Sequence, residues 1–137
     1  MLRQQRDSAL FNSYQEALKE RTFASQKEAI NYVLSTPAPE WFVSREFCAA
    51  VISSRLRGKD HYKMSRIKRR KFDALFELYQ QLRSQPAYQN LSHRDLCEMI
   101  VMTPAPEWFL HYDVAAMILL RQRKLRNDKV ARRYGRK

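Results

Sequence analysis

Positively charged side chains gather in two stretches of this sequence, where they could bind a polyanion. Residues 55–71 hold nine Lys or Arg against one acid, Asp60, and residues 121–137 hold nine against Asp128. The two stretches carry 18 of the 26 basic residues, whereas the rest of the chain has 8 basic and 12 acidic residues. The net charge of +12 is therefore concentrated, which favours a polyanionic partner over a general role in solubility.

Lys and Arg side chains bind phosphates by ion pairing, and the release of counterions supplies most of the non-specific affinity for nucleic acid. A single charge run is more often a solvated helix face or a basic tail. Two such runs in a chain that is otherwise net acidic favour nucleic-acid binding. The candidate phosphate-binding residues are Arg55, Arg57, Lys59, Lys63, Arg66, Lys68, Arg69, Arg70, Lys71, Arg121, Arg123, Lys124, Arg126, Lys129, Arg132, Arg133, Arg136 and Lys137.

An internal repeat relates the two basic stretches. The heptapeptide Thr-Pro-Ala-Pro-Glu-Trp-Phe occurs at residues 36–42 and again at residues 103–109, an offset of 67 residues in a chain of 137. At that offset Arg57 matches Lys124, Lys59 matches Arg126, Arg66 matches Arg133, Arg69 matches Arg136 and Arg70 matches Lys137. If the two halves share a fold, the basic stretches should occupy equivalent places on each.

Helical patterns surround the heptapeptides. Apolar residues recur with helical spacing over residues 10–18, 29–34, 47–52, 72–82, 96–101 and 114–119. Ser25 and Ser92 each precede an acid by three residues, which is the pattern of a capping box. The chain has only two Gly, and Gly58 is expected to end the third helix.

We therefore predict an all-α protein of about six helices packed together, built as a tandem duplication of a three-helix unit. The first unit is expected at residues 1–70 with a basic C-terminal end, and the second at residues 71–137 with a basic C-terminal tail. The heptapeptide is interpreted as scaffold: its prolines end one helix and stiffen the chain, and its Trp-Phe pair anchors the connector. Glu40 and Glu107 would be poor contacts for phosphate.

No known catalytic pattern occurs in the sequence. It has no glycine-rich phosphate loop, no His-Glu-x-x-His and no Gly-x-Ser-x-Gly. His93 and Cys97 are spaced to share a helix face, but two ligands are too few for a metal site. We expect no enzyme activity, no catalytic residue, no cofactor and no metal.

No apolar run approaches the roughly 18 residues that cross a bilayer. The N-terminus is polar without a secretory pattern, and two cysteines do not make a disulfide framework. We expect an intracellular protein, in the cytoplasm or the nucleoid or nucleus.

The sequence thus predicts a non-enzymatic nucleic-acid-binding protein, with DNA slightly favoured over RNA. The alternative is a small helical assembly subunit that docks its basic segments on an acidic protein partner. An anionic membrane surface is a third possibility, weakened because residues 121–137 contain no Trp or Phe to insert.

Overall fold

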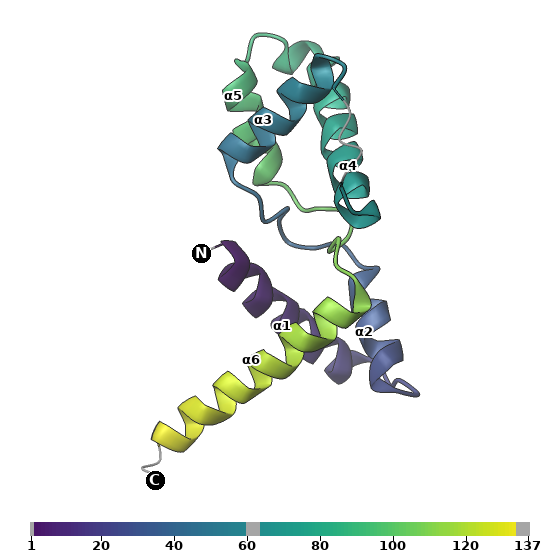
Figure 1. Cartoon of the computed structure of the whole chain (residues 1–137), viewed down its shortest axis with the longest axis vertical. Coiled ribbons are helices and arrows are strands. Elements are labelled where there is room, and N and C mark those ends of the chain that lie inside the picture. The colour runs from purple at the N-terminus through teal and green to yellow at the C-terminus, as the bar shows by residue number, and fades with distance from the viewer. Residues whose placement is uncertain (1, 60–63, 134–137) are drawn as a thin grey trace. The chain divides into compact units, whose positions relative to one another are not determined.

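The computed structural model describes residues 2–59 and 64–133, with side chains described up to residue 129. The described chain is all-helical, as predicted, with six α-helices and one short 3₁₀ turn, and it contains no β-strand beyond a single bridge (Figure 1). The helices are α1 (Leu2–Glu20), α2 (Gln26–Leu34), α3 (Arg45–Leu56), α4 (Arg66–Arg83), α5 (His93–Val101) and α6 (Tyr112–Arg133), and the turn is η1 (Pro86–Tyr88).

Serine caps begin four of the helices. The Oγ atoms of Ser25, Ser44, Ser65 and Ser92 each accept a hydrogen bond from the backbone N–H three residues on, at 3.0–3.2 Å. Each such cap contributes about 1 kcal/mol to helix stability. At the start of α2, Glu28 also accepts from the N–H of Ala24 at 2.9 Å. The caps predicted at Ser25 and Ser92 are therefore confirmed.

The described helices form two compact units that do not coincide with the two halves of the sequence. One unit contains α1, α2 and α6, and the other contains α3, α4, η1 and α5. In the first unit α1 packs on both α2 and α6; in the second, α3 packs on both α4 and α5. The two compact units are therefore not divided at residue 70, where the sequence repeat divides the chain. Instead, the last helix of each sequence half packs with the first two helices of the other half.

The same kinds of position fill both cores. In the first unit α1 packs on α6, and Leu10 and Tyr14 of α1 are buried, as are Ile118 and Leu119 of α6. In the second unit Val51 and Ile52 match Ile118 and Leu119 at the 67-residue offset, and Leu75 and Tyr79 match Leu10 and Tyr14 at an offset two residues shorter; all four are buried as well. The exchange of α3 and α6 thus preserves the apolar pattern of each core. The tandem duplication itself remains a prediction from the sequence.

The two heptapeptides meet inside the second unit. Ala38 and Ala105 form an isolated antiparallel bridge, with both N···O distances at 3.0 Å. Trp41 stacks on Phe109 and Phe42 stacks on Trp108, with ring centroids 5.8 and 5.9 Å apart. Both tryptophans are 3% exposed, which confirms the predicted role of the Trp-Phe pairs as anchors.

The end of each heptapeptide has an uncommon backbone. Phe42 and Phe109 have φ values of +56° and +53°, in the left-handed region that residues with a side chain seldom adopt. Such a conformation costs of order 1–2 kcal/mol and requires surrounding contacts to hold it. The aromatic stacks described above supply these contacts at both positions.

Candidate nucleic-acid interface

The first basic stretch includes the end of α3 and the start of α4 in the second unit. Helix α3 ends after Leu56, and Gly58 follows with φ +74°, as predicted for a helix-ending glycine. Helix α4 then begins at Arg66, and five of its first six residues are basic. Helices α3 and α4 pack side by side and are joined through this stretch, so its cations lie at the C-terminal end of α3 and at the N-terminal end of α4.

Some of these cations are used inside the unit. Arg55 pairs with Asp73 of α4, and its side chain is only 15% exposed. Arg70 pairs with Glu107 of the second heptapeptide. Both pairs tie α4 to its neighbours, so these two residues have structural roles besides any contact with a ligand.

Other cations of this stretch point to solvent. Arg57, Lys59, Arg66 and Lys68 are exposed, and their side chains form no ion pair or hydrogen bond with any described residue. Arg69 and Lys71 are partly buried and have partners. Lys63 lies outside the described residues. Helix α4 has no acid in its first turn, so its positive dipole end adds to the positive potential there.

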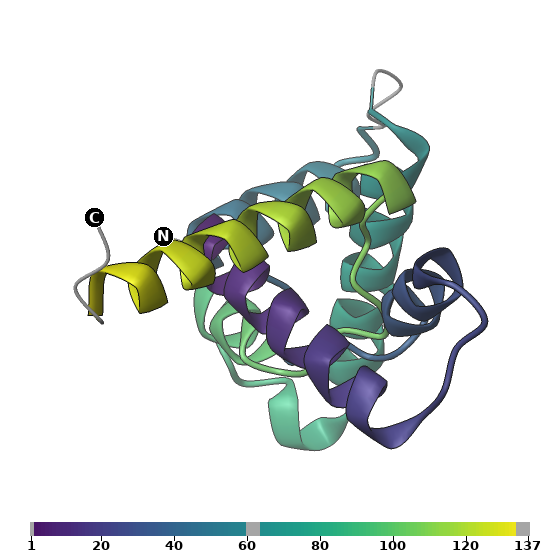
Figure 2. The ribbon, with the colours of Figure 1, turned by 90° about the horizontal axis from the view of Figure 1, so that it is seen from below.

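The second basic stretch lies on α6, which continues as one helix to Arg133. In Figures 1 and 2, α6 crosses α1 and its C-terminal half runs on past it. Arg121, Arg123, Lys124 and Lys129 are exposed and have no side-chain partner among the described residues.

Arg126 differs from the other cations of α6. Its guanidinium lies 4.3 Å from the ring centroid of Phe11 and donates to Asn12 Oδ1 at 2.9 Å, so it fastens α6 to α1. The side chains of Arg132 and Arg133, and the whole of Arg136 and Lys137, lie outside the described part of the chain.

The two basic stretches match in sequence but differ in local structure. Arg57 caps the end of α3, whereas Lys124, its match, lies in the middle of α6. Lys59 follows Gly58, whereas Arg126 packs on α1. The position matching Gly58 is Leu125, and this difference lets α6 continue where α3 stops. The expected equivalence of the two patches is therefore absent at these positions.

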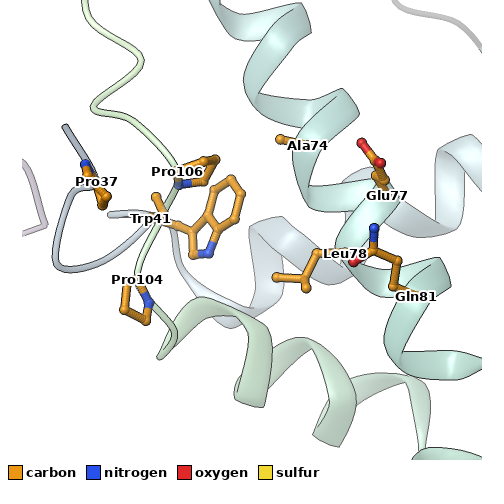
Figure 3. A pocket seen from close by; sticks show the side chains of 9 residues that line it. Pro37, Trp41, Ala74, Glu77, Leu78, Gln81, Pro104 and Pro106 are labelled. Atoms are coloured by element: carbon orange, nitrogen blue, oxygen red, sulfur yellow. The ribbon is translucent and has the colours of Figure 1, made fainter. Parts of the chain in front are cut away.

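An open groove of about 460 Å³ lies in the second unit (Figure 3). Pro37, Trp41, Pro104 and Pro106 of the heptapeptides form one wall, and α4 forms the other through Ala74, Glu77, Leu78 and Gln81. Its lining is mostly apolar and lacks cations, so the groove does not suit phosphate.

A polar cluster that the sequence did not reveal connects the helices of the second unit. His93 Nδ1 lies 3.1 Å from the hydroxyl of Tyr79, and its Nε2 lies 3.0 Å from both Ala49 O and Ser53 Oγ. Arg83 donates to the same Tyr79 hydroxyl and to two backbone carbonyls. The partners are 14 to 44 residues from His93, beyond the reach of local pattern analysis.

Two cysteines lie beside this cluster. Cys48 and Cys97 are fully buried, and a hydrogen bond to Cys97 together with burial raises the pKa of the Cys48 thiol far above its usual range. Cys97 Sγ lies 3.9 Å from His93 Nε2. Nowhere in the described ranges do three or more His, Cys, Asp or Glu residues form a group that could hold a metal ion.

Comparisons with models of known protein families, with curated proteins and with solved structures give no match. Among the described helices, none combines the length and the apolar character that crossing a bilayer requires.

Proposed function

We propose that this chain is a non-enzymatic nucleic-acid-binding protein that contacts phosphates through its two basic stretches. The observation that carries the proposal is the C-terminal half of α6. Of its residues 120–129, five are Lys or Arg and one is acidic, and all but Gln122 are exposed. A nucleic-acid partner places the protein inside the cell, in the cytoplasm or the nucleoid or nucleus.

Unpaired cations on one helix repel one another, and a polyanion relieves that repulsion. Four of the five cations in residues 120–129 have no partner among the described residues. Each phosphate that such a side chain neutralises releases a condensed counterion, which drives binding entropically. The exposed cations around the end of α3 and the start of α4 would add further phosphate contacts in the same way.

The shape of the α6 segment favours DNA over RNA. An α-helix is about 10–12 Å across with its side chains, and the major groove of B-form DNA is about 12 Å wide. The major groove of A-form RNA is deep and too narrow for side chains to read. A protruding basic helix therefore fits a DNA duplex better than an RNA duplex.

A titration at several salt concentrations tests this function. The full-length chain would be titrated into labelled duplex DNA, single-stranded RNA and anionic phospholipid vesicles. We expect the logarithm of the DNA association constant to fall linearly with the logarithm of salt concentration, with a slope of about −0.9 per phosphate neutralised. If the protein bound neither the DNA duplex nor the single-stranded RNA at low salt, the proposed function would be ruled out.

A second candidate function rests on exposed leucines within the basic stretches. Leu56, Leu120 and Leu125 are 54–68% exposed beside the cations. Apolar side chains among cations would suit an acidic protein partner with apolar anchors, as an assembly subunit requires. Failure to bind nucleic acid, together with salt-sensitive capture of one acidic protein, would favour this alternative.

A further inference from the structure

One face of the exposed half of α6 has the composition of a surface that reads base edges. Residues Leu120, Arg123, Lys124 and Asn127 have the spacing i, i+3, i+4 and i+7, which places them on one side of an α-helix. All four are exposed, and Leu120 is 68% exposed. This set is called the α6 outer face below.

The opposite side of the same helix is fixed by packing. Ala115, Ile118 and Leu119 of α6 are 0–4% exposed and belong to the core of the first unit. Arg126 holds the helix to Phe11 and Asn12 of α1. The outer face therefore has a fixed orientation, whereas a loop or tail would have to be ordered on binding.

The four residue types are those that distinguish base pairs in the major groove. Arg and Lys bind the O6 and N7 acceptors of guanine, Asn binds adenine through its N6 and N7 atoms, and an apolar side chain contacts the thymine methyl group. Arg121 lies on the same helix to one side of this face, where it can contact a flanking phosphate, whereas Lys129 lies on the opposite side of the helix. Residues 120–129 span about 15 Å, the length of a helix segment that enters the groove.

We propose that α6 enters the major groove of B-form DNA and reads sequence through Leu120, Arg123, Lys124 and Asn127. This inference rests on the proposed function and goes beyond it, because phosphate binding alone requires no preferred sequence. Leu120 and Asn127 are uncharged and lie beside cations. Their substitution therefore separates sequence reading from electrostatic attraction.

The test uses full-length protein and a pool of DNA duplexes with a randomised centre. We expect the natural protein to enrich a short motif containing at least one adenine that depends on Asn127. In the Asn127→Ala variant, discrimination at that position should fall by about 5- to 150-fold, the value of one bidentate base contact. Leu120→Ala should relax preference at a neighbouring thymine. The salt slope on non-specific DNA should not change in either variant.

A matched control comes from the same unit. Leu18→Ala combined with Asn31→Ala removes the same two residue types from exposed positions on α1 and α2, and should leave the motif unchanged. Circular dichroism melting would establish that all variants stay folded.

The outcomes separate the two proposals. Salt-dependent binding to duplex DNA without any enriched motif, or a motif that survives both outer-face substitutions, would overturn sequence reading and leave the proposed function standing. Absence of duplex binding at low salt would overturn sequence reading, and absence of binding to single-stranded RNA as well would overturn the proposed function.

Discussion

Ala38 and Ala105, the third residues of the two heptapeptides, exchange two backbone hydrogen bonds. Each amide nitrogen lies 3.0 Å from the carbonyl oxygen of the other residue, and both side chains are 2% exposed. The two connectors therefore meet at one point, beside the paired Trp-Phe stacks. Each copy of the heptapeptide supplies half of this junction.

Replacing Ala105 with proline should weaken the junction. Proline has no amide hydrogen, so the variant cannot donate to the carbonyl of Ala38, and a buried acceptor remains unpaired. We expect the free energy of unfolding to fall by about 1–3 kcal/mol. Denaturant unfolding followed by Trp fluorescence measures it. Ala105→Gly keeps the amide, so it shows the cost of changing the side chain at this buried position while the bond is retained; equal destabilisation in both variants would contradict the role of the bond.

The last helix of each sequence half, α3 or α6, packs with helices of the other half, and this predicts which helices a core substitution destabilises. Ile118 of α6 is 1% exposed, and its truncation to alanine should cost about 2–5 kcal/mol. Because α6 packs on α1 and α2, hydrogen exchange under native conditions should accelerate in those helices. Ile52→Ala in α3 should instead accelerate exchange in α4 and α5. If Ile118→Ala loosened α4 and α5 and left α1 unchanged, the assignment of α6 to the first unit would be wrong.

The threonines that begin the heptapeptides should respond differently to substitution. Thr103 Oγ1 donates to the carbonyl of Ile100 and accepts from Trp41 Nε1 at 3.2 Å, whereas Thr36 Oγ1 donates to the carbonyl of Val33. Thr103→Val leaves the buried indole N–H of Trp41 without an acceptor, which should lower the free energy of unfolding by about 1–3 kcal/mol. Thr36→Val, which makes the same change of shape, should cost less. Thermal melting of the two variants compares them directly, and equal destabilisation would argue against the indole bond.

The cysteine thiols should be inert in the folded protein. Cys48 and Cys97 are fully buried, which keeps thiol reagents away from both. Their hydrogen bond raises the pKa of Cys48 and lowers the pKa of Cys97, so Cys48 is also kept from forming the reactive thiolate, whereas Cys97 is protected by burial alone. We expect no modification by iodoacetamide in native buffer and modification of both residues in denaturant, as measured by intact mass. Rapid labelling of the native protein would show that the packing of α3 on α5 opens.

Local features of the fold could be predicted from the sequence, because their causes lie within a few residues. The serine caps and the stop at Gly58 each depend on hydrogen bonds or backbone angles spanning three or four positions. The exchange of α3 and α6 could not be predicted in this way. Val51 and Ile52 present the same kind of aliphatic pair as Ile118 and Leu119, so either helix satisfies either core by pattern alone.

The candidate site could also be predicted only in part, because the sequence shows where the cations are but not which distant residues they contact. Charge counts locate the cations, but they do not show which cations are already paired. Arg55 pairs with Asp73, which is 18 residues away in the sequence, and Arg70 pairs with Glu107, which is 37 residues away. Arg126 donates a hydrogen bond to Asn12, which is 114 residues away. Only the folded chain shows that these three arginines stabilise the unit in which each lies, while Arg121, Arg123 and Lys124 remain exposed.

The salt dependence of DNA binding in paired charge variants tests the central claim most directly. Arg121→Gln with Lys129→Gln removes two exposed α6 cations, and Arg3→Gln with Lys19→Gln removes the same types from exposed positions outside the basic stretches. We predict that the first pair makes the slope of log K against log salt shallower by about 0.9 for each phosphate that α6 no longer neutralises, and that the second pair leaves the slope unchanged. Equal slopes for both pairs and the natural protein would contradict phosphate binding by α6.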